Sequence, residues 1–207
     1  MAVADIGKKD FVWTLIATLF KIGAGLLLFP FVLRMLPAAT VGIWTIFTVI
    51  TQLTFIFDFG FNASFARNVS YVFSGVRTLK KEGYESVAPD SCDNVDYKLL
   101  GATIKSMRFF YSRMALIFFL LLATLGTFYI YTLMQNYTGD VREVYVSWII
   151  LVILNSYNLY TLYYESLLNG RGLIKSAHQI IFIGNFVYLA FAIVLILLGG
   201  GLVAIVL

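Results

Sequence analysis

Long apolar segments recur along the chain and are separated by short polar ones. A helix needs about 20 apolar residues to cross the roughly 30 Å hydrocarbon core of a bilayer, and each segment reaches that length. A further apolar stretch starts after three glycines near the end of the sequence. The pattern predicts an all-α polytopic membrane protein with about five complete transmembrane helices plus the start of a sixth. The five segments cover 11–36, 41–61, 109–134, 144–168 and 174–198.

Polar residues between the segments predict where helices begin and break. Thr40 offers a hydroxyl N-cap for the second segment. Gly60 predicts a break at the end of that segment, followed by an amphipathic helix that continues through Arg67 to about Phe73. The long polar stretch 76–108 is expected to be a cytoplasmic connector, with a helix that starts near Asp96 and leads into the third segment.

Composition supports the membrane assignment. Hydrophobic residues make up 60% of the 207-residue chain, aromatic residues 17%, and the mean hydropathy is +0.88, which excludes a soluble domain of this size. The net charge of +4 does not indicate nucleic-acid binding, and the single cysteine, Cys92, excludes an internal disulfide. Because the chain ends within apolar sequence, we expect it to be a fragment, with 1–207 forming one N-terminal transmembrane lobe.

The distribution of basic residues predicts the orientation. Cytoplasmic loops of membrane proteins carry an excess of Lys and Arg, so the side with more of them is expected to be cytoplasmic and to hold the N-terminus. Only Arg34 and Arg142 fall on the opposite side. The residues on the cytoplasmic side are Lys8, Lys9, Arg77, Lys80, Lys81, Lys98, Lys105, Arg108, Arg171 and Lys175.

The first candidate site residue is Lys21, which lies about 10 residues into the first segment, near the bilayer midplane. It shares a narrow helical face with Thr14, Thr18 and Gly25. A lysine at this depth is costly unless it faces protein or water, and its stem is too short to reach the interface. We therefore expect Lys21 to face an internal cavity rather than to snorkel.

The second segment carries a polar face made of Thr48, Thr51, Asp58 and Asn62, which lie within about 80° of one another on a helical wheel. This face favours a buried or water-filled environment. The alternative is that Asp58 lies at the lipid headgroups, because about 20 residues from position 41 already cross the hydrocarbon core.

The fourth segment carries a second polar stripe, about 60° wide, made of Ser147, Asn158, Thr161 and Glu165. We expect Asn158, like Asn62, to offer hydrogen bonds to a substrate. Glu165 and Asp58 come at similar depths, about 20 and 17 residues from the outer ends of their segments. Two nearby carboxylates ionise together only with a cation close by. We therefore predict that Asp58, Glu165 and Arg67 form an inner gate.

Four stretches together resemble the N-terminal half of polysaccharide-export flippases of the Wzx type, within the multidrug/oligosaccharidyl-lipid/polysaccharide exporter superfamily. These stretches are 29–37 (FPFVLRMLP), 41–44 (VGIW), 58–67 (DFGFNASFAR) and 168–174 (LNGRGLI). The patterns are loose but cover nearly the whole chain. The connector 76–108 is longer than the family pattern leads us to expect.

The resemblance implies one lobe of a two-lobed transporter in the inner membrane, which flips a polyprenyl-diphosphate-linked oligosaccharide to the outer leaflet by alternating access. It implies membrane lipids and glycan-assembly proteins as further partners, without a cofactor, metal or nucleic acid. The residues give this a physical basis, since a diphosphate that crosses hydrocarbon needs cations such as Lys21 and Arg67.

The sequence leaves other functions open. A cation-coupled multidrug antiporter of the same superfamily would use Asp58 or Glu165 to bind a proton or sodium ion, although Lys21 would repel an organic cation. A membrane-embedded glycosyl or phosphoglycosyl transferase would need acidic or metal-binding clusters, and the long connector contains only scattered acids. The only histidine, His178, is expected to be interfacial rather than a ligand. A non-transporting scaffold would not explain the polar helix faces.

Overall fold

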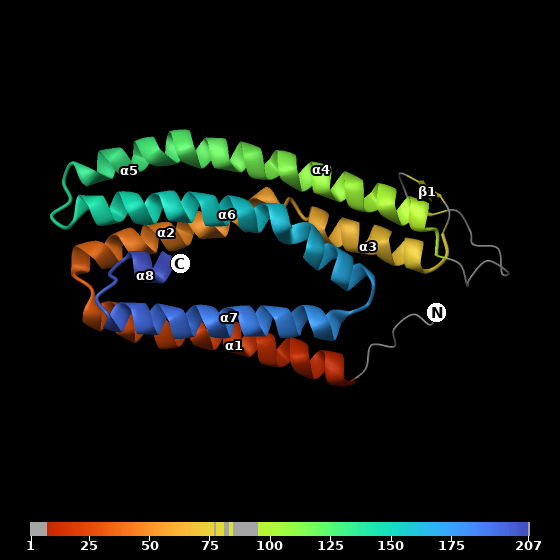
Figure 1. Ribbon diagram of the computed structural model, residues 1–207, viewed down its shortest axis with the longest axis horizontal. Helices are drawn as coiled ribbons and strands as arrows, with labels where there is room; N and C mark the ends of the chain where they lie inside the picture. The colour runs from red at the N-terminus through yellow and green to blue at the C-terminus, as the bar shows by residue number, and fades with distance from the viewer. Residues whose placement is uncertain (1–7, 77, 81–82, 85–94, 207) are drawn as a thin grey trace.

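The computed structural model describes residues 8–76, 78–80, 83–84 and 95–206. It shows an all-α polytopic membrane protein, as predicted, whose described part contains five helices long and apolar enough to cross a membrane (Figure 1). These are α1 (Lys8–Met35), α2 (Ala38–Phe57), the continuous α4–η2–α5 rod (Tyr97–Met134), α6 (Val141–Gly170) and α7 (Ile174–Leu197). The shorter elements are α3 (Phe61–Phe73), β1 (Leu79–Lys80), β2 (Gly83–Tyr84) and α8 (Val203–Val206).

The start of α2 differs from the prediction. The helix begins at Ala38, its N-cap is Pro37, and no side chain caps it, so Thr40 is not the N-cap. Proline is well suited here because its ring fixes φ and its missing N–H needs no partner. Thr40 lies instead within the first turn, where its hydroxyl is 3.1 Å from the Tyr137 hydroxyl of the α5–α6 loop. This contact ties the first turn of α2 to the α5–α6 loop.

The predicted break between α2 and α3 is confirmed. Phe59 and Gly60 both adopt left-handed backbone conformations, with φ of 50° and 75°. A left-handed φ is ordinary for glycine but unfavourable for phenylalanine, so the two residues mark a strained kink. The Asp58 carboxylate accepts hydrogen bonds from the Asn62 backbone N–H at 3.2 and 3.4 Å. These bonds fix the start of α3.

The rod formed by α4 (Tyr97–Leu121), η2 (Leu122–Gly126) and α5 (Thr127–Met134) is longer than a bilayer requires. Its 38 residues span about 57 Å, against about 30 Å of hydrocarbon. Asp96 caps the start of the rod, because its carboxylate accepts hydrogen bonds from the backbone N–H groups of Lys98 and Leu99. The predicted helix start near Asp96 is confirmed. The last residues of the connector 76–108 therefore belong to α4, while 77, 81–82 and 85–94 lie outside the described residues.

Glycine turns close the second half of the chain. Asp140 caps α6, and Gly172 adopts a φ of 79° between α6 and α7. After α7, Gly201 has a φ of 54°, and the Glu143 carboxylate accepts a hydrogen bond from the Leu202 N–H that follows it. Glu143 thus holds the loop that leads into α8, the predicted start of a sixth span.

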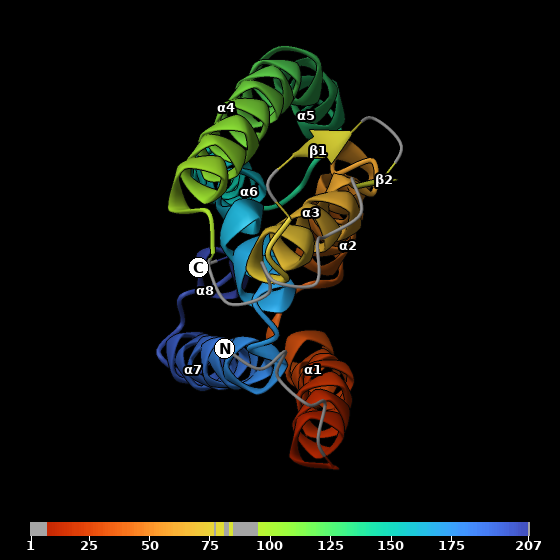
Figure 2. The same cartoon turned by 90° about the vertical axis from the view of Figure 1, so that its right-hand side faces the viewer.

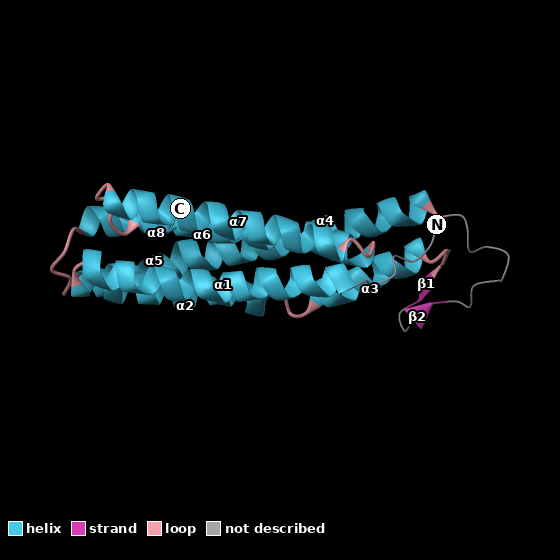
Figure 3. Ribbon diagram, turned by 90° about the horizontal axis from the view of Figure 1, so that it is seen from below, coloured by secondary structure: helices cyan, strands magenta, loops and turns pink. Residues whose placement is uncertain are grey.

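The helices pack as two groups. One consists of α2, α3, α4, α5 and α6 around an apolar core that includes Phe47, Tyr111 and Trp148. The other is the pair α1 and α7, which packs with α8 around Val32 and Ala192. Figure 2 shows the α1–α7 pair beside the larger group, and Figure 3, seen from below, shows the pair in front of it. Only limited contact joins the two groups. We therefore expect a cleft at the boundary between the two groups.

The orientation is tested by cysteine labelling in a Cys92→Ser background. Thr138→Cys lies in the exposed α5–α6 loop, and Arg171→Cys lies at the α6–α7 turn, at the opposite end of α6. The positive-inside distribution predicts that an impermeant maleimide labels position 138 in intact cells and position 171 only after permeabilisation. The reverse pattern would invert every depth assigned to the cleft residues.

Candidate functional site: a polar cleft between two helix groups

A cleft lies between the α1–α7 pair and the helices α2 and α6. It has two adjoining compartments of about 540 and 600 Å³. We call the first the Glu165 compartment, because Glu165 and Thr161 of α6 line it, and the second the Asn185 compartment, because Asn185 of α7 and Gln52 of α2 line it. Their size is that of typical small-molecule sites, although each is more open than an enclosed cavity.

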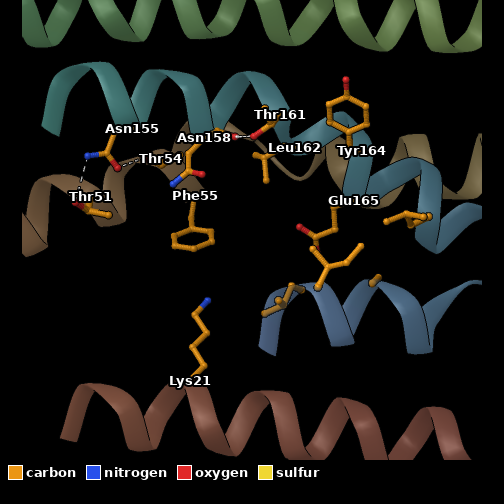
Figure 4. Close-up of a pocket in the computed structure, with 14 residues that line it drawn as sticks. Lys21, Thr51, Thr54, Phe55, Asn155, Asn158, Thr161, Leu162, Tyr164 and Glu165 are labelled. Atoms are coloured by element: carbon orange, nitrogen blue, oxygen red, sulfur yellow. Dashed lines mark hydrogen bonds between the residues drawn. The ribbon is translucent and has the colours of Figure 1, made fainter. Parts of the chain in front are cut away.

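Lys21 lines both compartments (Figure 4). It projects from α1 across the cleft towards α2, and its Nζ lies 5.4 Å from the ring centroid of Phe55. A ring face attracts a cation but leaves its N–H donors free. Within the described part of the chain, Lys21 forms no ion pair with a carboxylate. Its charge is therefore directed into the cleft and is available to an anion.

Amide side chains form the wall opposite Lys21. Asn155 joins α6 to α2, because its Nδ2 donates to Thr51 at 3.3 Å and its Oδ1 accepts from Thr54 at 3.4 Å. Asn158, one turn along, lines both compartments, and its amide has no hydrogen-bond partner in the part of the chain that the structure describes. Asn155 is thus structural, whereas Asn158 offers both donors and acceptors to a ligand.

Glu165 also faces the cleft, where Figure 4 shows it beside α7. No Lys or Arg of the described chain pairs with its carboxylate. The predicted gate partner Arg67 is exposed on α3, lines neither compartment and forms no ion pair with Glu165 or Asp58. The structure thus brings Lys21, Asn158 and Glu165 to one cleft and leaves Arg67 outside it.

Asp58 and Asn62 point away from the cleft into the larger helix group. The Asp58 carboxylate accepts a 2.6 Å hydrogen bond from the Tyr111 hydroxyl of α4, and the Asn62 Oδ1 accepts a 2.6 Å bond from Ser166 of α6. These bonds connect the α2–α3 kink to both neighbouring helices. The kink explains why Asn62 departs from the predicted continuous stripe, because two left-handed residues change the direction of every later side chain.

We expect Tyr111→Phe to destabilise the protein by about 1.5–3 kcal/mol, because it removes a hydrogen bond to a carboxylate that has no cationic partner among the described residues. The measurement is thermal or denaturant unfolding in a neutral detergent. Tyr131→Phe, which alters a 57% exposed tyrosine on α5, is the matched control. Equal stability of the two variants would show that the Asp58–Tyr111 bond does not hold the kink.

Phe55, Gln52 and Asn185 also line the cleft and were not predicted from the sequence. The Asn185 side chain lines the Asn185 compartment, and its Nδ2 donates to the Ile181 carbonyl at 2.7 Å. A single amide in the middle of an otherwise apolar segment was a usable signal, since such residues rarely face lipid. No sequence pattern indicates Phe55 as a cleft residue, because its contact with a cation depends on Lys21 of another helix.

Comparison of the chain with protein-family models, with curated proteins and with solved structures found no match.

Proposed function

We propose that the chain forms one lobe of a flippase that moves a polyprenyl-diphosphate-linked oligosaccharide from the cytoplasmic to the outer leaflet of the cell membrane. The observation that carries the proposal is the position of Lys21, a cation directed into a polar cleft between two helix groups. A buried or membrane-embedded lysine without an internal carboxylate favours an anionic ligand, and the diphosphate supplies one.

The remaining cleft residues fit the other parts of such a ligand. Asn158, Gln52 and Asn185 present amides to the Asn185 compartment, and amides pair with sugar hydroxyls as both donors and acceptors. The polyprenyl chain stays in the bilayer, so only the head group needs the polar path. Glycan-assembly proteins at the cytoplasmic face are the proposed source of the substrate.

Alternating access follows from the packing of the two groups. Because the α1–α7 pair shares only limited contact with the rest of the chain, it can rock against α2 and α6 with little loss of packed surface. Such a motion would change the distance between Lys21 on α1 and the amide wall on α6. We propose this pair as the moving element of the lobe.

A cation-coupled antiporter is the second candidate, and Glu165 is the observation that favours it. Its carboxylate lines the cleft without an ion-pair partner in the described chain, as a site for a proton or sodium ion would require. In the flippase proposal the same carboxylate couples transport to a cation.

The proposal is tested with the protein in proteoliposomes that contain a fluorescent polyprenyl-diphosphate-linked disaccharide. Dithionite, which does not cross the bilayer, bleaches the outer leaflet only. We expect bleaching to exceed half of the fluorescence when the protein is present and to stop near half in protein-free liposomes. Bleaching that stops near half in both samples would contradict a flippase.

A further inference from the structure

A second site candidate lies outside the cleft, on the surface where α4 packs against α6, at the end where the connector enters α4. Tyr160 comes about 19 residues after the start of α6, which places it roughly 29 Å along the helix, at the edge of the hydrocarbon core. The first turns of α4 extend beyond that edge, because the rod is longer than the bilayer. This surface therefore lies at headgroup level, in the leaflet that the basic residues assign to the cytoplasm.

Arg108 of α4 is held against α6 by one hydrogen bond. Its Nε donates to the Tyr160 hydroxyl at 3.0 Å, which fixes the plane of the guanidinium. No carboxylate pairs with Arg108, and its two terminal amino groups have no partner among the described residues. An oriented guanidinium with two free amino groups matches the bidentate geometry of a phosphate.

Lys105 and Ser112 lie on the same face of α4 as Arg108, three residues before it and four after it. Both are exposed, and neither side chain forms a hydrogen bond or ion pair within the described chain. Lys105 adds a second positive charge, and Ser112 adds a hydroxyl donor. Together the three supply the charge and the donors that a phosphate monoester or diester requires.

Tyr160 belongs to a cluster of three tyrosine rings on α6. The Tyr160 and Tyr163 rings lie 5.7 Å apart, and those of Tyr163 and Tyr164 lie 4.1 Å apart. Tyr163 is buried, whereas Tyr164 is 54% exposed. Exposed tyrosines are typical of the membrane–water interface, where the ring contacts lipid and the hydroxyl contacts headgroups. Tyr164 also lines the Glu165 compartment, so the tyrosine cluster adjoins the cleft.

An apolar surface continues from these residues into the hydrocarbon. Towards the bilayer centre, Leu116 lies one turn from Ser112 on α4 and is 51% exposed. Ile153 lies two turns from Tyr160 on α6 in the same direction and is 54% exposed. A free phosphate would gain nothing from this surface, whereas the acyl chains of a lipid would cover it. The combination of a phosphate-binding set and an adjoining apolar surface indicates a lipid.

We propose that Arg108, Lys105, Ser112 and Tyr160 bind the phosphate of an anionic lipid headgroup in the leaflet at this end of the protein. The site is separate from Lys21 and lies beside the cleft rather than in it. It does not depend on the flippase proposal, since a membrane protein of any activity can hold a lipid at such a surface.

The test measures binding of dioctanoyl phosphatidic acid to the purified protein in a neutral detergent, by thermophoresis. We expect saturable binding that Arg108→Gln weakens about tenfold and Lys105→Gln weakens severalfold, because each removes a charge that faces the phosphate. Arg113→Gln is the matched control and should change the affinity by less than twofold. Arg113 is also exposed on α4, but it points about 140° away from Arg108 and lies 5.2 Å from the Phe109 ring centroid.

Two further ligands separate the possible sources of phosphate. Dioctanoyl phosphatidylcholine, which is zwitterionic, and inorganic phosphate should each bind at least tenfold more weakly than phosphatidic acid. Equally tight binding of inorganic phosphate would overturn the lipid assignment and leave a free-phosphate site. Equal weakening by Arg113→Gln and Arg108→Gln would show general electrostatic attraction, and unchanged binding by both Arg108→Gln and Lys105→Gln would place the lipid elsewhere; either result would overturn the proposal.

Discussion

Replacing Lys21 with alanine is expected to reduce flipping of the diphosphate-linked disaccharide at least tenfold in proteoliposomes. The side chain is directed into the cleft, contacts Phe55 through its Nζ and forms no ion pair among the described residues. A charge-assisted hydrogen bond to an anion contributes about 1.5–3 kcal/mol, which corresponds to tenfold or more in rate or affinity. Lys21→Arg keeps the charge and should retain part of the activity.

Arg34→Ala is the matched control for Lys21→Ala. It removes a cation from the last turn of the same helix, outside the cleft. We expect its flipping rate to stay within twofold of the unaltered protein. Normal flipping by a stably folded Lys21→Ala variant would mean that Lys21 is a packing residue and that the cleft uses another cation.

Replacing Gly170 with valine is expected to destabilise the protein by about 3 kcal/mol or more. Gly170 ends α6 where it crosses α3, and a Cβ built there would lie 2.5 Å from the Ala66 carbonyl oxygen and 2.5 Å from the Val69 Cβ. Because one of these atoms is backbone, the clash cannot be relieved by a rotamer change, and α3 must separate from α6.

Gly101→Val provides the comparison for Gly170→Val. Gly101 is exposed on α4, and a Cβ there would meet no atom within 4 Å. The thermal midpoint in neutral detergent should fall strongly for Gly170→Val and change little for Gly101→Val, since valine and glycine have similar helix propensities. A small effect of Gly170→Val would mean that α3 is not packed closely against α6.

The helices could be predicted from the sequence because membrane thickness sets the length of an apolar segment, independently of tertiary contacts. For α7, the predicted segment 174–198 and the observed Ile174–Leu197 differ by a single residue. The break at Gly60 and the cap at Asp96 were also predictable, since both follow from local backbone chemistry. The Thr40 cap was wrong because Pro37 starts the helix three residues earlier.

The cleft was only partly predictable, for a geometric reason. Lys21, Asn158 and Glu165 each lie within one regular helix, so a helical wheel indicates which of their neighbours share a face. Asp58 and Asn62 flank two left-handed residues, and a wheel of 100° per residue does not hold across them. Their partners, Tyr111 and Ser166, lie more than 50 residues away in the chain, and no local pattern identifies such pairs.

The central claim, that the cleft receives an anionic diphosphate-linked glycan through Lys21, is tested most directly by ligand binding. Binding of a short-chain polyprenyl-diphosphate-linked disaccharide is compared with binding of tetraphenylphosphonium, for the unaltered protein and for Lys21→Ala. We predict that the diphosphate ligand binds the unaltered protein at least tenfold more tightly than it binds Lys21→Ala, and that tetraphenylphosphonium does not bind the unaltered protein. Tight, Glu165-dependent binding of tetraphenylphosphonium, with no effect of Lys21→Ala on the diphosphate ligand, would contradict it and favour the antiporter.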